Sequence, residues 1–289
     1  MLDLTKEFKE VKIISAVSWY ILTMVIVIFI PIILGYDNLL ENDNLLSLLS
    51  SSLFIAIMLF KFRLSPNKLI LLIKDYKQKV NIKELLGVVG TQLCLSMGIS
   101  LLVIGIVYFK FPDFLNELLT DSAVDSYSTY SGLVTVMLIT VVCAPLAEEM
   151  LFRAVIFKRT SKKFNIYVGI IVSSLIFGLL HIELAIIGAF LFGVACCILY
   201  TKYRNILIPM TVHFLNNLIA FLPQIDISAP VETAPLTASD AQAYLGMGGI
   251  LFLIGMFFFI KFVNKNKHYL KKGFASSVSK SPLLENPMK

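Results

Sequence analysis

Long apolar segments separated by short polar loops follow one another through the 289-residue chain. A helix of about 20 apolar residues crosses a hydrocarbon core about 30 Å thick. The pattern predicts about eight such helices, of which the fifth, ending in a histidine, is the least clearly bounded. Their expected ranges are 11–36, 46–62, 85–109, 132–157, 166–181, 184–203, 206–222 and 246–263. We therefore expect an all-α polytopic membrane protein, and we interpret the first segment as a retained helix, not a signal peptide.

Composition excludes the soluble alternatives. Hydrophobic residues make up 57% of the chain and charged residues 15%, against about 45–50% and about 25% in soluble domains. A soluble fold of this length could not bury so much apolar surface. The net charge of +6 is spread over short loops, which favours the lipid bilayer as partner and argues against nucleic acid. The four cysteines lie in apolar runs without metal-binding spacing, so we expect no disulfide framework.

Basic and non-basic loops alternate along the chain. Residues 61–83 contain seven Lys or Arg, whereas 36–45 and 223–245 contain none. Because basic loops stay on the cytoplasmic side, this alternation places both termini in the cytoplasm. Eight helices satisfy the pattern, and seven or nine would break it.

Three regions are expected around these helices. Residues 1–130 hold the first three helices and a connector, 131–222 a core of helices four to seven, and 223–289 the last helix and a basic tail. The connector, 64–84, is predicted to be a helix lying on the cytoplasmic surface, with Ser65 and Pro66 at its start. A solvated basic connector is the alternative. The tail from 264 to 289 is expected to be mostly disordered.

Ionisable side chains inside the fourth predicted helix are candidates for function, because an unpartnered charge in a membrane is costly. Glu149 and Arg153 are four positions apart, so they share one helix face and can pair. Glu148 lies further round the helix and is less able to use that charge. We assign Glu148 as a general base and Glu149–Arg153 as the pair that holds it. A purely structural ion pair is the alternative for Glu149 and Arg153.

The seventh predicted helix presents His213 and Asn217 four positions apart on one face. Neutral donors aimed at one point can stabilise an oxyanion, while Asn216 is expected to face elsewhere. Pro209, one turn earlier, is expected to loosen the helix and open space for water or substrate. A packing role for the histidine and interhelical bonding for the asparagine are the alternatives.

Depth in the membrane offers a test. At 1.5 Å per residue, Glu148 lies about 15 Å and His213 about 13 Å from the basic ends of their helices. His181, at the end of the fifth helix, lies about 20–25 Å from the start of that helix. The fifth helix must therefore be tilted for His181 to lie at the depth of Glu148 and His213. The joint occurrence of these polar groups favours a site over packing. The small-residue pairs Gly169/Ser173 and Ser174/Gly178 are expected to allow close helix packing.

Three motifs in this order resemble the CPBP family of intramembrane proteases, which includes the CaaX prenyl endopeptidases and bacteriocin-processing or immunity (Abi-like) relatives. They are EExxxR at 148–153, FxxxH at 177–181, opened by Phe177, and HxxxN at 213–217. The resemblance covers about residues 130–222. It implies an eight-helix fold with an intramembrane site open to the cytoplasm. It further implies that Glu148 and His181 activate the attacking water while His213 and Asn217 stabilise the oxyanion.

The resemblance favours a mechanism without a metal. The alternative is a divalent cation such as zinc held by Glu148, His181 and His213, a two-His-one-carboxylate set. No HExxH motif is present, so its ligands would come from three helices. The serine motif GxSG of rhomboids and the GxGD motif of presenilins are also absent.

Three functions compete at this stage. The first is an endopeptidase acting on a membrane-associated peptide or protein, in a membrane that we expect to be bacterial. The second is a non-catalytic immunity or regulatory protein that binds a bacteriocin-like peptide or a sensor kinase. A transporter is the weakest, because no inverted repeat is visible. The substrate and the oligomeric state stay open.

Overall fold

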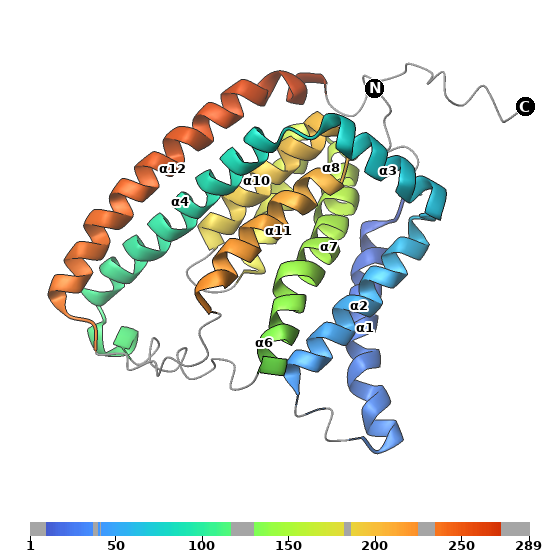
Figure 1. Cartoon of the computed structure of the whole chain (residues 1–289), viewed down its shortest axis with the longest axis horizontal. Helices are drawn as coiled ribbons and strands as arrows, with labels where there is room; N and C mark the ends of the chain where they lie inside the picture. The colour runs from blue at the N-terminus through green and yellow to red at the C-terminus, as the bar shows by residue number, and fades with distance from the viewer. Residues whose placement is uncertain are drawn as a thin grey trace, which may run out of the picture.

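Helices account for nearly all of the chain that the computed structural model describes, namely residues 10–36, 40, 42–116, 130–181, 186–224 and 235–272 (Figure 1). Each of the eight predicted apolar segments contains one helix, and no strand occurs in these residues. The long helices are α1 (Ile13–Leu34), α2 (Asp43–Lys61), α4 (Ile82–Tyr108), α10 (Ile186–Tyr203) and α12 (Ala238–Lys272); α3 (Pro66–Lys79), α9 (Ile166–Leu179) and α11 (Leu207–Phe221) are shorter. The predicted all-α polytopic fold is confirmed.

Six helices of the described residues are long and apolar enough to cross a membrane. The other two, α9 and α11, have 14 and 15 residues, which corresponds to about 21–23 Å. They are therefore shorter than a hydrocarbon core of about 30 Å. Eight crossings, and the side of the membrane on which each loop lies, remain predictions.

The fourth apolar segment is one continuous helical rod, Tyr130–Lys163, with two π-helical stretches. Its parts are α6 (Tyr130–Met137), η3 (Leu138–Cys143), α7 (Ala144–Glu149), η4 (Met150–Phe157) and α8 (Lys158–Lys163). The Ala144 N–H donates to the carbonyl of Ile139, five residues back. Pro145 has no N–H and crowds the preceding turn, which accounts for the wider winding just before it. The hydropathy pattern does not indicate this change from α-helical to π-helical winding.

One end of the bundle gathers the polar loops. Lys202 at the end of α10 bonds Glu84 in the first turn of α4 at 2.6 Å. Arg159 of α8 donates to the carbonyl of Val11, just before α1, at 2.5 Å. The helices thus run alternately toward and away from this end, as the loop charges require (Figure 1). We call it the basic end, since it carries Lys61, Lys79, Arg159, Lys202 and Lys265.

A helix, α3, forms within the predicted connector, but it ends at Lys79 and residues 82–84 already belong to α4; its place on the cytoplasmic surface stays a prediction. Its first N–H groups are capped as expected, because the Ser65 hydroxyl accepts from the Lys68 N–H at 3.4 Å. The helix lies across the basic end (Figure 1) and is packed down, with Asp75 bonded to the Asn205 amide at 2.9 Å. Tyr76 and Thr211 further join α3 to α11 through their hydroxyls at 3.2 Å. These contacts disfavour the solvated alternative.

Helix α12 extends beyond its predicted range. Asn266 and Leu270 are buried, and the helix continues to Lys272, so predicted disorder is wrong for residues 264–272. Burial against α4 and α10 offsets the polar composition of that stretch. The rest of the predicted tail, 273–289, lies outside the described residues.

Glycines let α12 and α4 lie side by side (Figure 1). A Cβ on Gly98 would sit 2.6 Å from the backbone nitrogen of Phe252, and one on Gly248 would sit 2.9 Å from the carbonyl oxygen of Gly98. The close packing predicted for the small residues of α9 is also confirmed. A Cβ on Gly169 would overlap Ser161 of α8, and one on Gly178 would sit 2.9 Å from the Ile186 carbonyl oxygen of α10.

Candidate active site

Two of the predicted site residues face each other across helices α7 and α11. The distance from Glu148 Oε2 to His213 Nε2 is 3.8 Å, and their side chains are 29% and 4% exposed. Glu148 Oε2 has no hydrogen-bond partner among the described residues, although that atom is buried. A carboxylate oxygen of α7 and a ring nitrogen of α11 thus face each other. The equal depths estimated for these residues agree with this contact.

The second glutamate connects the two helices. Glu149 Oε1 lies 2.9 Å from Arg153 Nη1 and 3.0 Å from His213 Nδ1. Glu149 and Arg153 are fully buried. The predicted i,i+4 pair therefore forms, but the ring that it holds in place is that of His213. Consecutive helical residues point about 100° apart, so Glu148 and Glu149 reach His213 from different directions.

The contact with Glu149 orders the imidazole. Nδ1 of His213 carries the hydrogen that it donates to the Glu149 carboxylate, because a carboxylate can only accept. Nε2 is then the nitrogen turned to Glu148. A hydrogen bond on one ring nitrogen fixes what the other can do, as at many catalytic and metal-bound histidines. The buried pair of Glu149 and Arg153 is thus a support for His213.

Aromatic rings enclose this support. The Arg153 guanidinium carbon lies 4.6 Å from the centroid of the Phe177 ring, a distance that permits cation–π attraction. The His213 ring packs edge-on against Phe177 at 5.9 Å and against Phe192 at 5.0 Å. Sequence reasoning missed Phe192, since one phenylalanine in an apolar run gives no signal of its own.

His181 stands apart from the other candidates. Its Nδ1 lies 2.7 Å from the carbonyl oxygen of Phe177, and its ring packs at a tilt of 43° against the Phe177 ring with a centroid distance of 4.4 Å. Within the described part of the chain, no hydrogen bond or ion pair joins His181 to Glu148 or His213. The residue follows the last turn of α9. It is near the site through Phe177 and does not reach Glu148 directly.

Asn217 binds the backbone of the π-helical stretch. Its side-chain amide donates to the carbonyl of Thr140 in η3 at 2.8 Å, which leaves the second N–H of that amide for another acceptor. The side chain of the neighbouring Asn216 donates its amide to Asn217 Oδ1 at 3.2 Å. The irregular winding of η3 thus supplies a carbonyl that fixes the asparagine.

Pro209 does not loosen its helix, and that prediction is wrong. Helix α11 begins at Leu207 and is continuous to Phe221. Pro209 therefore lies in the first turn, where helical N–H groups have no partner within the helix and a missing one costs nothing. His213 and Asn217 are in regular α-helix.

The geometry does not assemble the alternative metal ligands. No group of three or more His, Cys, Asp or Glu that could hold an ion occurs among the residues described. Of the three alternative ligands, Glu148 and His213 approach each other, but His181 is turned to a backbone carbonyl.

Comparisons with known proteins point to the same region. Residues 130–219 match the family model described as type II CAAX prenyl endopeptidase Rce1-like. The chain is also 25% identical over 216 residues to a protein of Bacillus subtilis named "Putative membrane peptidase YdiL", covering 74% of this chain and 84% of that protein. No solved structure matches significantly. Every candidate residue described above lies inside the region that matches the family model.

Proposed function

We propose that this chain is a CPBP family intramembrane endopeptidase that uses Glu148 to activate water; the match of residues 130–219 to the Rce1-like family model and the similarity to a membrane peptidase support the family. Its substrate is a membrane-associated peptide or protein. One observation carries the proposal: the unpartnered Oε2 of Glu148 faces Nε2 of His213 at 3.8 Å, and His213 is held from behind by Glu149. In this proposal a water molecule binds at Glu148 Oε2 and His213 Nε2.

The contacts of the cluster support this assignment. Glu149 is held by the Arg153 guanidinium at 2.9 Å, whereas Glu148 is the carboxylate that faces Nε2 of His213 at 3.8 Å. In the proposed role Nε2 of His213 carries a hydrogen and donates it to the oxyanion, as the motif resemblance implies.

The proposed reaction has two steps. Glu148 takes a proton from water, and the oxygen adds to the substrate carbonyl carbon. The oxyanion accepts hydrogen bonds from His213 Nε2 and from the free N–H of Asn217. The tetrahedral intermediate then breaks its C–N bond, and the leaving amine receives the proton from Glu148. Glu149, Arg153 and Phe177 are positioning residues in this scheme.

For His181 we propose a second contact to the attacking water. Its Nδ1 is bonded to the Phe177 carbonyl, so Nε2 is the atom that would bind the water. We further propose that the site opens toward the cytoplasm of a bacterial cell, because the basic end of the bundle is the end that the positive-inside rule retains there.

The test uses the full chain, purified and reconstituted in lipid vesicles, with a library of quenched peptides. Glu148→Gln removes the base while keeping the shape, and we expect cleavage to fall by about 10²–10⁴-fold with an unchanged thermal melt. Glu10→Gln is the matched control, because Glu10 lies outside the site at the basic end. It should cleave like the wild type.

Two further arms separate the alternatives. Cleavage that Glu148→Gln retains would contradict the proposed base. If a strong chelator abolishes cleavage and zinc restores it, Glu148 and His213 are metal ligands instead of the base and the oxyanion donor. A non-catalytic immunity or regulatory protein predicts a cellular phenotype that survives Glu148→Gln, so the same variant is tested by complementation of a deletion strain.

A further inference from the structure

A second site lies at the basic end, away from the catalytic cluster. Helices α4, α10 and α12 line an open cavity of about 190 Å³ there. Both α4 and α12 contribute polar or charged residues as well as apolar ones. Its lining comprises Glu84, Gly87, Val88, Thr91 and Gln92 of α4, Ala195 of α10, and Phe258, Phe259, Lys261, Phe262 and Lys265 of α12.

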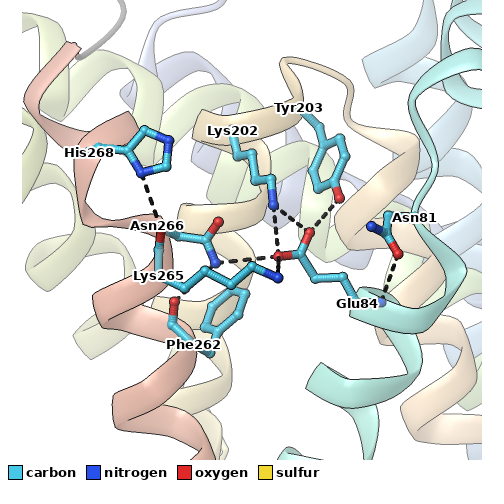
Figure 2. Close-up of polar contacts among 8 residues, drawn as sticks. All are labelled: Asn81, Glu84, Lys202, Tyr203, Phe262, Lys265, Asn266 and His268. Carbon is cyan, nitrogen blue, oxygen red and sulfur yellow. Dashed lines mark hydrogen bonds and ion pairs between the residues drawn. The ribbon is translucent and has the colours of Figure 1, made fainter.

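The only carboxylate in this lining is already satisfied. Figure 2 shows the Lys202 ammonium between both oxygens of Glu84, at 2.7 and 2.6 Å. The Tyr203 hydroxyl also donates to Glu84, and the Asn266 amide does so at 3.4 Å. With these three partners in place, Glu84 has little capacity left for another cation. The network ties the starts and ends of three helices together.

Two lysines at the mouth of the cavity are therefore left in excess. Lys265 Nζ is 3.9 Å from Glu84, and its side chain is 68% exposed. Lys261 lies one turn away on the same helix and has no ion pair among the residues that the structure describes. Three lysines against one glutamate leave two positive charges beside the opening.

The apolar part of the lining suits a hydrocarbon chain. Phe258 and Phe262 lie one turn apart on α12, and Val88 lines the cavity from α4. Gly87 leaves the α4 side open, since a Cβ there would meet nothing within 4 Å. An apolar slot beside a pair of exposed lysines matches an amphiphile with an anionic head.

We propose that this cavity binds an anionic phospholipid of the surrounding bilayer. The phosphate sits between Lys261 and Lys265, and an acyl chain follows Phe262 and Phe258 toward Gly87. Charge complementarity selects the head group, and the position of the lysines at the polar end of a membrane helix places them at head-group depth. A bound lipid would join α12 to α4. This inference needs the membrane location of the chain and does not depend on protease activity.

The experiment reconstitutes the full chain in nanodiscs of zwitterionic phosphatidylcholine, with or without about one-third phosphatidylglycerol. We expect phosphatidylglycerol to raise the melting temperature and to stay bound in native mass spectra. The double variant Lys261→Gln/Lys265→Gln should lose both effects, with about tenfold weaker retention. The control, Lys267→Gln/Lys271→Gln, removes the same charge from the same helix outside the cavity and should behave like the wild type.

A second pair of variants tests the apolar part of the cavity lining. Gly87→Leu fills the slot, whereas Gly90→Leu adds the same side chain to the same helix where it also meets nothing within 4 Å. Only Gly87→Leu should reduce retention of the lipid. Equal loss in both lysine pairs would overturn the site in favour of general surface charge. A melting shift that inorganic phosphate reproduces in phosphatidylcholine nanodiscs would overturn the lipid as occupant.

Discussion

Glu149 Oε1 is shared by two donors, Arg153 at 2.9 Å and His213 at 3.0 Å, in a place without access to solvent. The two adjacent glutamates therefore have different surroundings. Glu148 faces Nε2 of His213, where we propose that water binds, and Glu149 is paired with Arg153 behind it. Glu148 differs by its Oε2, which has no hydrogen-bond partner among the described residues, and Glu149 differs by its complete burial.

Glu149→Gln should therefore damage the fold as well as the reaction. It leaves Arg153 buried without a counter-charge, and breaking a buried pair costs about 3–5 kcal/mol. The double variant Glu149→Gln/Arg153→Met removes both charges and should recover much of the melting temperature in detergent. Cleavage should stay low, because His213 loses its orienting acceptor. Recovery of cleavage together with stability would show that the pair is only structural.

Phe177→Leu tests the ring that holds the arginine. The leucine keeps the site apolar but removes the aromatic face beneath Arg153, a contribution of about 2 kcal/mol in a desolvated site. We expect a lower kcat with little change in KM. Phe164→Leu is the control, because Lys163 lies 5.3 Å from the centroid of that ring and Phe164 is 62% exposed. An equal effect of both changes would contradict the positioning role of Phe177.

At the scale of elements, two features set how the helices contact one another. Gly98 and Gly248 let α4 and α12 approach closely, because they leave no room for side chains. The π-helical stretch η3 contains Thr140, whose carbonyl accepts from Asn217 of α11. Both depend on exact neighbours and are invisible in hydropathy.

Gly98→Leu should separate α4 from α12. The new side chain would collide with the backbone of α12, and overpacking of this kind costs about 1–3 kcal/mol or more. We expect a lower melting temperature and weaker retention of the lipid. Gly90→Leu on the same helix has open space and should leave the melting temperature close to that of the wild type.

For the whole molecule, the alternating helices make a single prediction about orientation. Lys267→Cys at the basic end should be protected from a membrane-impermeant maleimide in intact cells. Asn44→Cys, in the first turn of α2 at the other end, should react. Labelling after permeabilisation confirms that both thiols are accessible. The opposite pattern would reverse the orientation and place the site opening outside the cytoplasm.

Sequence alone determined the class of fold and the residues of the cluster. A single segment satisfies all of its own backbone groups in lipid only as a helix, so apolar length was enough to find all eight segments. Charges in those segments are costly, so Glu148, Arg153 and His213 were conspicuous without any coordinates. The connector helix followed from the cap at Ser65, because capping is a local interaction.

The tertiary structure determined which residues of different helices contact one another. The register of α11 against α7 places His213 on Glu149 as well as beside Glu148, and no spacing within one helix can specify a contact between two. The same holds for Phe192, for the carbonyl of Thr140 and for the lysines left over after Glu84 is paired. Hydropathy reports whether each side chain is more stable in water or in lipid. These contacts depend instead on how each helix is rotated about its axis and on how closely it approaches its neighbours.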